Sequence, residues 1–305
     1  MDYSNIKLEN IQPTWLPPQL RAAMLRLDLL HPDISGNKWF KLRHNLALAR
    51  AAGKHTILTF GGAYSNHIAA TAAACKMAGL QSIGIIRGEA TATPSHTLLQ
   101  AAAQGMQLEF VSRELYRQKE AIPWTTQFPD AYLIPEGGHN AAGAQGCEAI
   151  LSLVPTQEFS HIICAVGTGT TLAGLINSAL PHQQLSGIVV LKGAQYLADE
   201  VASLLKPRLQ IAATQPASAT PPSWQLLHHL HGGGYARTSP ALIDFINTFY
   251  RETSIPLDIV YTGKMMWGFR ELVQQGYFPA NSRILLIHSG GLQGNLSLSS
   301  NVLCF

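Results

Sequence analysis

Charged side chains are scarce in this sequence of 305 residues, because Asp, Glu, Lys and Arg together make up only 13% of it. The 21 basic and 18 acidic residues are scattered along the chain and leave a net charge of +3. A protein surface that binds nucleic acid or a membrane usually carries clustered basic residues, so we expect neither nucleic acid nor a membrane as a partner. The hydrophobic share of 47% excludes a disordered chain and is enough for one large core or two smaller ones.

Cysteine is also scarce, and its four residues form no Cys-x-x-Cys pair. A disulfide framework and a zinc site, or any other metal centre, are therefore not expected. No apolar run approaches the ~18 residues that a membrane-spanning helix needs. The first residues, MDYSNIKLENIQPTWLPPQL, lack the basic and apolar regions of a signal peptide. These absences predict a cytoplasmic protein with buried, reduced thiols.

Short apolar runs alternate with helix-like segments along most of the chain. The runs are rich in Ile, Val and Leu, which is typical of strands covered on both faces. The predicted strands are 55–60, 81–88, 108–112, 161–167, 187–193, 257–262 and 283–291. The predicted helices are 39–52, 66–78, 95–104, 141–154, 171–180, 195–205, 240–252 and 264–275. This alternation predicts an α/β fold whose sheets are mostly parallel and flanked by helices.

The length and the order of these segments predict two lobes. Residues 42–150 contain their own strand–helix series and are expected to form a small inserted α/β lobe. Residues 1–41 and 151–305 would then form the large lobe. The segment 206–223, rich in Pro, Ala and Thr, is expected to be a surface loop or a degenerate strand followed by a loop.

A glycine- and threonine-rich loop separates the strand 161–167 from the helix that follows. It consists of Gly167, Thr168, Gly169, Thr170 and Thr171. Backbone N–H groups and the helix dipole make such a loop an anion site, and threonine hydroxyls add donors. Leu172 stands where a dinucleotide-binding loop has its third glycine, so the motif indicates a phosphate group or only an ordinary strand–helix turn.

Two lysines near residue 40 are candidate nucleophiles. Lys38 follows Gly36 and Asn37 at the start of a predicted helix, where the dipole disfavours a cation and lowers the pKa of an amine. Lys41 lies one helical turn further on, but it is not preceded by a Gly-Asn pair, which beside Lys38 would let a ligand come close. The alternative for Lys38 is an ordinary exposed lysine.

The segment GGAYSNH, residues 61–67, places a second glycine turn between a predicted strand and a helix. Ser65, Asn66 and His67 open that helix, whose N-terminus would suit a substrate carboxylate. The alternative is that Ser65 or Asn66 only caps the helix. Two other predicted strands end in polar residues, at Tyr261 and at Ser289, and ligands gather at the carboxyl ends of strands in such sheets.

Together these motifs are typical of a site in which a phosphorylated aldehyde cofactor is bound covalently to a lysine amine. SGNK (35–38), GGAYSNH (61–67), IPEGGHN (134–140), GTGTT (167–171), VYTGK (260–264) and HSGG (288–291) resemble the D-cysteine desulfhydrase and 1-aminocyclopropane-1-carboxylate deaminase family. The resemblance runs from about Leu27 to Gly291. It implies a fold-type II pyridoxal-phosphate enzyme, similar to the tryptophan synthase β-subunit, and a homodimer that acts on a small amino acid as a lyase or hydrolase.

The resemblance also implies a role for each matched residue. Lys38 would bind pyridoxal phosphate as a Schiff base, residues 167–171 would bind its phosphate, Asn66 its 3′-oxygen, and Ser289 its ring nitrogen. Tyr261 would stack on the ring and act with Lys38 and Ser65 in catalysis. The residues expected to bind the substrate are Ser65, Asn66, His67, Tyr235 and Thr262.

The choice of reaction depends on two of these positions. The family's deaminases have Glu and Leu where this chain has Thr262 and Ser289, whereas its desulfhydrases have small hydroxyl residues at both. We therefore expect D-cysteine to be converted to pyruvate, sulfide and ammonia. Deamination of the cyclopropane acid, or lyase chemistry on another small amino acid, is the alternative within the family. A binding module would have no need of Lys38, and Leu172 argues against a nucleotide-dependent dehydrogenase.

Overall fold

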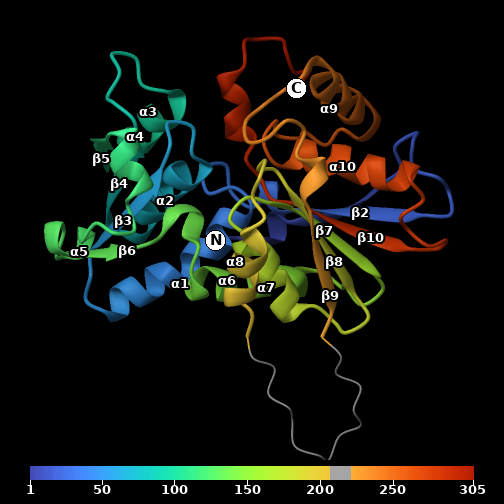
Figure 1. Cartoon of the computed structure of the whole chain (residues 1–305), viewed down its shortest axis with the longest axis horizontal. Helices are drawn as coiled ribbons and strands as arrows, with labels where there is room; N and C mark the ends of the chain where they lie inside the picture. The colour runs from blue at the N-terminus through green and yellow to red at the C-terminus, as the bar shows by residue number, and fades with distance from the viewer. Residues whose placement is uncertain (207–220) are drawn as a thin grey trace, which may run out of the picture.

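The computed structural model describes residues 1–206 and 221–305, and two sheets organise this part of the chain (Figure 1). The large sheet has six strands in the order β1-β2-β10-β7-β8-β9, and the small sheet has four in the order β5-β4-β3-β6. All neighbouring pairs are parallel except β1 and β2. The α/β fold with helix-flanked parallel sheets is confirmed.

The elements have the following bounds. The strands of the large sheet are β1 (Lys7–Ile11), β2 (Arg21–Arg26), β7 (His161–Val166), β8 (Gln184–Val189), β9 (Ser223–Leu227) and β10 (Arg283–His288). Those of the small sheet are β3 (Thr56–Gly61), β4 (Gln81–Arg87), β5 (Met106–Val111) and β6 (Ala131–Leu133). The helices are α1 (Asn37–Ala51), α2 (Asn66–Ala78), α3 (His96–Ala103), α4 (Arg113–Arg117), α5 (Trp124–Gln127), α6 (Ala141–Cys147), α7 (Thr170–Ser178), α8 (Leu197–Ser203), α9 (Pro240–Thr253) and α10 (Thr262–Gln274).

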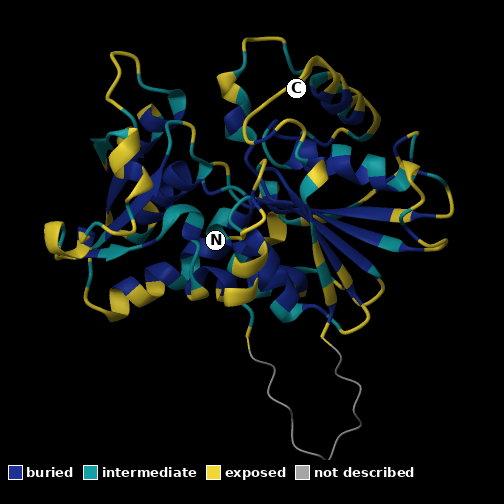
Figure 2. Cartoon of the chain, viewed as in Figure 1, coloured by how far each residue is buried: buried dark blue, intermediate teal, exposed yellow. Residues whose placement is uncertain are grey.

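The large sheet is covered on both faces, as its continuous apolar strands require. On β10, Ile284 and Leu286 pack with residues of α9 and α10, whereas Leu285 and Ile287 pack with residues of α7 and α8. Successive side chains of a strand point to opposite faces of the sheet. The side chains on both faces of β10 are buried (Figure 2). This double burial explains why the strands read as unbroken apolar runs instead of alternating patterns.

The small sheet is made of strands that all lie between residues 56 and 133. One of its faces packs against α1 and α2 through residues such as Leu42 and Ala74, and the other packs around Trp124 of α5. The limits of the two lobes at 41/42 and 150/151 stay a prediction. Within the described residues, no helix is both long enough and apolar enough to cross a membrane.

Two predicted elements are wrong. Residues 257–261 are not a strand, because the Asp258 side chain accepts hydrogen bonds from the backbone N–H groups of Val260, Tyr261 and Thr262 and folds this segment into a turn. The predicted helix 141–154 is α6 followed by a 3₁₀ helix over Glu148–Leu153. Of the predicted loop 206–223, residues 207–220 lie outside the described residues, and Ser223 begins β9.

Candidate active site

Four helices begin beside the carboxyl ends of strands, and their N-termini surround the candidate site. The helices α2 and α7 directly follow β3 and β7, while α1 begins against the segment after β10, where Asn37 N donates to Ser289 O at 3.2 Å. The helix α10 begins after the Asp258 turn. Helix N-termini carry free N–H groups and a partial positive charge, so this arrangement favours an anionic ligand.

The start of α1 depends on a glycine that no other residue could replace. Gly36 has φ +65° and ψ −140°, and a Cβ atom there would lie 1.8 Å from the carbonyl oxygen of Ser289. Only glycine fits a left-handed backbone at such a close approach. The Gly-Asn pair therefore brings Lys38 directly to the HSGG segment that follows β10.

Lys38 has the environment of a reactive amine. Its Nζ donates to Asn37 Oδ1 at 2.8 Å and lies 5.8 Å from the centre of the Tyr261 ring. Burial and the nearby charge of Lys41 lower the pKa of Lys38 to about 7. With this pKa about half of the Lys38 amine is neutral at pH 7, and the neutral amine can attack a carbonyl group or accept a proton.

Lys41 faces a different part of the site. Its Nζ lies 3.4 Å from Thr168 Oγ1, in the glycine–threonine loop, and burial lowers its pKa as well. The two lysines thus lie at opposite ends of the site, where the aldehyde and the phosphate of a phosphorylated aldehyde would bind. This arrangement favours Lys38 for the covalent bond and Lys41 as a cation for the phosphate. Sequence reasoning considered Lys41 only as a competitor, although its spacing one turn from Lys38 puts it on the same face of α1.

The glycine–threonine loop gathers hydroxyl groups at the N-terminus of α7. Thr168 Oγ1 and Thr170 Oγ1 are 3.0 Å apart, and Thr171 Oγ1 accepts from Asn37 Nδ2 at 2.8 Å. Gly169 has φ +79°, and Gly167 packs so closely on Tyr261 that a Cβ atom would lie 3.2 Å from its ring. Hydroxyls, free N–H groups and a nearby lysine are the donors that a phosphate group needs.

His139 joins this loop and was missed as a site residue. Its Nδ1 lies 3.0 Å from Thr170 Oγ1, and its Nε2 lies 2.6 Å from Glu200 Oε2 on α8. From the sequence, His139 is only a variation in the GGHN motif. Its position in space explains why the motif contributes to the site: it orients a hydroxyl of the loop.

Ser65 and His67 occupy the N-terminus of α2 in different ways. Ser65 is the N-cap, and its Oγ accepts from Ile68 N at 3.3 Å. His67 is buried and turns toward Thr59, whose Oγ1 lies 2.9 Å from Nε2 and donates to Ile134 O. Nε2 therefore carries the proton, while Nδ1 is buried without a hydrogen-bond partner among the described residues. Burial, followed by the charges of Lys38 and Lys41, lowers the pKa of His67 well below its usual range.

Two tyrosines meet beside Lys38. The rings of Tyr235 and Tyr261 are 6.1 Å apart in an edge-to-face arrangement, and their hydroxyl oxygens are 3.5 Å apart. Burial and the neighbouring Tyr235 raise the pKa of Tyr261 well above its ordinary value. Tyr261 is therefore a neutral phenol, able to donate a hydrogen bond, at any physiological pH.

The two hydroxyl residues that distinguish the family's reactions are not equivalent. The Thr262 hydroxyl is buried, donates to Asp258 Oδ1 at 2.7 Å and accepts from Asp258 N at 2.8 Å. The Ser289 hydroxyl makes no hydrogen bond to another described residue, while the Ser289 carbonyl holds the start of α1. Ser289 is thus the hydroxyl that is free to meet a ring nitrogen, and the contact of Thr262 with substrate stays a prediction.

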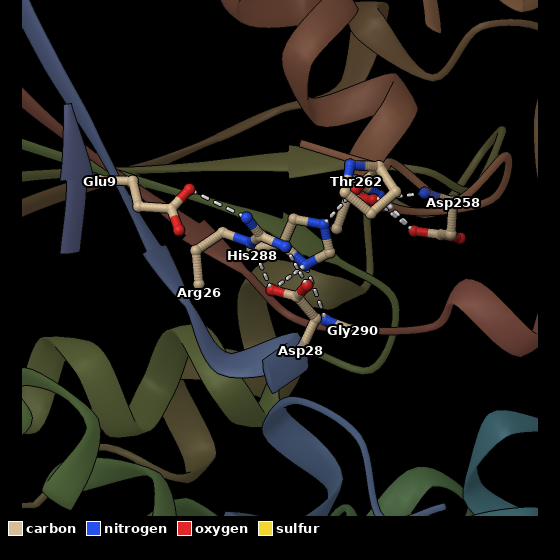
Figure 3. A network of polar contacts seen from close by, with 8 residues as sticks. Glu9, Arg26, Asp28, Asp258, Thr262, His288 and Gly290 are labelled. Atoms are coloured by element: carbon tan, nitrogen blue, oxygen red, sulfur yellow. Dashed lines mark hydrogen bonds and ion pairs between the residues drawn. The ribbon is translucent and has the colours of Figure 1, made fainter. Parts of the chain in front are cut away.

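A chain of polar contacts that is mostly buried joins Glu9, Arg26, Asp28 and His288, and it reaches the HSGG segment (Figure 3). Arg26 pairs with Glu9 at 2.9 Å and with Asp28 at 2.7 Å. Asp28 Oδ1 lies 3.1 Å from Nδ1 of His288, whose Nε2 lies 2.7 Å from the carbonyl oxygen of Pro256. The chain links the edge strand β1 to both segments that carry Ser289 and Tyr261, and sequence reasoning missed it because its members are far apart along the chain.

These residues fit pyridoxal phosphate. The amine of Lys38, with a pKa of about 7, suits its aldehyde. The α7 loop with Lys41 suits its phosphate, and the hydroxyl of Ser289 suits its ring nitrogen. Among the described residues, no group of three or more His, Cys, Asp or Glu side chains could hold a metal ion. The site offers an amine for an aldehyde at one end and donors for an anion at the other.

Comparison with known structures first defines the class of protein. A solved structure titled as an ACC deaminase homologue superposes with a TM-score of 0.76 at 26% identity, over 95% of this chain and 90% of that one. An O-acetylserine dependent cystathionine β-synthase from Helicobacter pylori shares the fold alone, with a TM-score of 0.67 at 14% identity, over 97% and 95% of the two chains. The fold is that of the type II pyridoxal-phosphate enzymes. The sequence profile described as pyridoxal-phosphate dependent enzyme matches residues 7–290, and the chain belongs to this family.

Curated relatives narrow the family further. A putative 1-aminocyclopropane-1-carboxylate deaminase of Pyrococcus horikoshii is 28% identical over 91% of this chain and 86% of its own. A bifunctional D-cysteine desulfhydrase/1-aminocyclopropane-1-carboxylate deaminase of Arabidopsis thaliana, described as mitochondrial, is 28% identical over 92% and 74%. The resemblance seen in the sequence and the pyridoxal-phosphate cofactor are confirmed. These relationships support a lyase, so the hydrolase class is a correction to the sequence analysis; the homodimer and the compartment stay predictions.

Proposed function

We propose that this enzyme eliminates thiol from D-cysteine and that ring opening of 1-aminocyclopropane-1-carboxylate is at most a minor activity. The observation that carries the proposal is the free hydroxyl of Ser289. A hydroxyl can donate to a neutral ring nitrogen but cannot keep it protonated as a carboxylate would. The carboxylate that contacts Thr262, that of Asp258, is occupied by three backbone N–H groups and the Thr262 hydroxyl.

A weaker electron sink is sufficient for β-elimination. When bound, pyridoxal phosphate delocalises the electron pair left at Cα. Thiolate is a good leaving group, so its loss tolerates a neutral ring nitrogen, whereas breaking a cyclopropane C–C bond demands a stronger sink. The overall balance is one D-cysteine and one water giving one pyruvate, one sulfide and one ammonia.

The chain's own residues can divide the remaining work. Asn66 and His67 are the first residues of α2, so their N–H groups have no intrahelical acceptor and can bind the substrate carboxylate. Lys38, with a pKa of about 7, can accept the Cα proton. The neutral phenol of Tyr261 beside Tyr235 can donate a hydrogen bond to the departing sulfur.

The proposal is tested by assaying D-cysteine, L-cysteine, β-chloro-D-alanine and 1-aminocyclopropane-1-carboxylate side by side. We expect kcat/KM to be highest for D-cysteine, with stoichiometric pyruvate and sulfide. Dominant turnover of the cyclopropane acid would overturn the proposal in favour of the second candidate, which the names of the relatives support. Turnover of none of the four would place the substrate outside this pair.

The role of Ser65 is tested separately from its role as a helix cap. Ser65→Ala should lower kcat/KM by about 100-fold or more if the hydroxyl takes part in proton transfer. It should also lower the free energy of unfolding by about 1 kcal/mol, because the N-cap is lost. Ser239→Ala removes the same kind of cap from α9, where Ser239 Oγ accepts from Leu242 N, and should cost similar stability without affecting turnover. Equal activities of the two variants would remove Ser65 from the mechanism.

A further inference from the structure

Gln293 connects the segment after HSGG to two helices that flank the small sheet. It lies in the 3₁₀ helix Leu292–Ser297, four residues beyond Ser289. Its Nε2 donates to Asn66 Oδ1 on α2, and its Oε1 accepts from Thr97 Oγ1 on α3 at 3.1 Å. Its carbonyl oxygen lies 2.9 Å from Nε2 of His96. The amide nitrogen, the amide oxygen and the backbone carbonyl of Gln293 therefore all contact residues about 200 positions away in the sequence.

These contacts determine which end of the Asn66 amide faces the site. Because Gln293 donates to the amide oxygen of Asn66, the Nδ2 group is the end of that amide that remains free to donate to a ligand. Asn66 Nδ2 lies on the side of Gly291, 2.9 Å from the position that a Cβ atom on that glycine would take. The opposite orientation would bring an oxygen to this side and leave the Gln293 amide facing another donor.

We propose that Gln293 is a positioning residue that presents Asn66 as a hydrogen-bond donor to the 3′-oxygen of the cofactor. The proposal rests on the role proposed for Asn66 in this site. A 3′-oxygen that bears negative charge needs a donor, and hydrogen bonds to charged groups are stronger than those between neutral groups. The bonds from Thr97 and His96 fix Gln293 in turn, so the orientation of one amide is set by α3, an element outside the cofactor site.

The cofactor itself reports on this hydrogen bond. Its visible absorption changes with pH as the protonated form of the bound chromophore is lost, and a donor at the 3′-oxygen lowers the midpoint of that change. Gln293→Glu has almost the same shape but offers Asn66 only acceptors, so the Asn66 amide should turn and present its oxygen to the site. We expect the spectral midpoint to rise by about one pH unit, which corresponds to about 1.4 kcal/mol.

Four comparisons make the result specific. Asn66→Ala should raise the midpoint as much as Gln293→Glu, and Thr97→Val, which removes a support of Gln293, should raise it less. Gln275→Glu adds the same charge at an exposed site and should leave it unchanged. Cofactor affinity, measured by equilibrium dialysis, should fall in Gln293→Glu and not in Gln275→Glu.

The outcomes separate this proposal from the proposed function, since none of these measurements needs a substrate. A raised midpoint in Asn66→Ala with an unchanged midpoint in Gln293→Glu would overturn the role of Gln293. An unchanged midpoint in both variants would overturn the role of Asn66 and with it the inference. A loss of thermal stability in Gln293→Glu without a spectral shift would show a merely structural contact, which also contradicts the proposal.

Discussion

Lys38 and Lys41 show how position within the site decides the role of an ionisable residue. Both amines have lowered pKa values because of burial, and they lie one helical turn apart. Only Lys38 lies near the Tyr261 ring and the HSGG segment, whereas Lys41 lies near Thr168. Their chemical difference therefore comes from the groups that face them and not from their intrinsic acidity.

Replacing each lysine should separate the covalent and the phosphate-binding functions. Lys38→Ala should lose the covalent bond to pyridoxal phosphate while the folded state survives, as measured by borohydride reduction with mass spectrometry and by circular dichroism. Lys41→Ala should keep the adduct on Lys38 but bind the cofactor more weakly, because a cation near the phosphate loop is gone. A reduced adduct found on Lys41 in the wild-type protein would contradict this assignment.

The pKa of Lys38 predicts how covalent attachment depends on pH. Only the neutral amine attacks the aldehyde, so the attachment rate of cofactor-free protein should rise with pH, with a midpoint of about 7. An unperturbed lysine would give a midpoint near 10.4. The charge of Lys41 lowers the pKa of Lys38, so Lys41→Met should move the midpoint to higher pH. Stopped-flow absorbance gives the rates, and a midpoint above 9 in the wild type would contradict the burial argument.

At the scale of elements, the site is assembled from the starts of helices, and glycines allow these starts to approach one another. The approach of α1 to the HSGG segment is the closest, since Gly36 leaves no room for a Cβ atom. The Asp258 turn plays the corresponding part for α10. In both cases a short sequence of small or capping residues decides where the following functional side chain lies.

Gly36→Ala should therefore be far more damaging than an alanine at another left-handed glycine. The new Cβ atom would clash with the Ser289 carbonyl, and we expect the free energy of unfolding to fall by more than about 3 kcal/mol and covalent cofactor binding to be lost. Gly53 has nearly the same φ of +67°, but a Cβ atom added there would meet no other group within 4 Å, so Gly53→Ala should cost only about 1 kcal/mol. Urea unfolding and the visible spectrum measure both effects. Similar losses in the two variants would mean that backbone strain, and not the clash, governs this site.

The elements that could be predicted from the sequence are those with strong apolar patterns and clear ends. The strands β3, β4, β5, β7, β8 and β10 are of this kind, as is α2, which Gly79 ends in the left-handed conformation. The strand β2, RAAMLR, begins and ends with arginine, and β6 has only three residues, so local pattern could not identify them. The apolar run after residue 256 misled the prediction because a side-chain carboxylate took the backbone N–H groups that a sheet would have used.

At the scale of the whole molecule, the charge network joins the beginning of the chain to its end. Glu9 and Arg26 come from β1 and β2, whereas His288 ends β10 (Figure 3). Asp28 is almost completely buried between Arg26 and His288. Removing its charge would leave Arg26 with one partner that is itself partly exposed to solvent.

Asp28→Asn should lower the free energy of unfolding by about 3 kcal/mol or more, as for other buried pairs that lose one partner. It should also weaken cofactor binding, because His288 holds both segments of the ring-binding side. Glu158→Gln is the matched control, since the Glu158–Arg283 pair lies at the opposite end of β10 and is exposed, and should cost at most about 1 kcal/mol. Chemical denaturation of both variants tests the difference; equal losses would show that the network contributes no more than a surface pair.

The motifs in the sequence could identify the parts of the site but not its interior. Lys38, Ser65, Asn66, Tyr261 and Ser289 lie in motifs whose local geometry is determined by a few neighbouring residues. Asp258 was missed although its contacts are local, because its carboxylate accepts from N–H groups two to four residues further on, within a run that reads as a strand. The other residues that sequence reasoning missed act through contacts between segments far apart in the chain: His139, Glu200, Asp28 and Gln293. No spacing rule relates such partners, so only the fold could bring them together.

The order of strands in the large sheet has a consequence for the way the protein is made. β2 pairs with β10, which the ribosome delivers more than 250 residues later, and β10 also separates β2 from β7. The small sheet, by contrast, uses strands that leave the ribosome in one uninterrupted stretch, so it can fold during translation. β1 and β2 must wait as a hairpin, with the other edge of β2 unpaired, until the last tenth of the chain emerges. Until then Arg26 and Asp28 are still in water. We expect nascent chains halted before residue 283 to expose this hairpin to chaperones and to bind no cofactor, because the ring-binding side of the site is synthesised last.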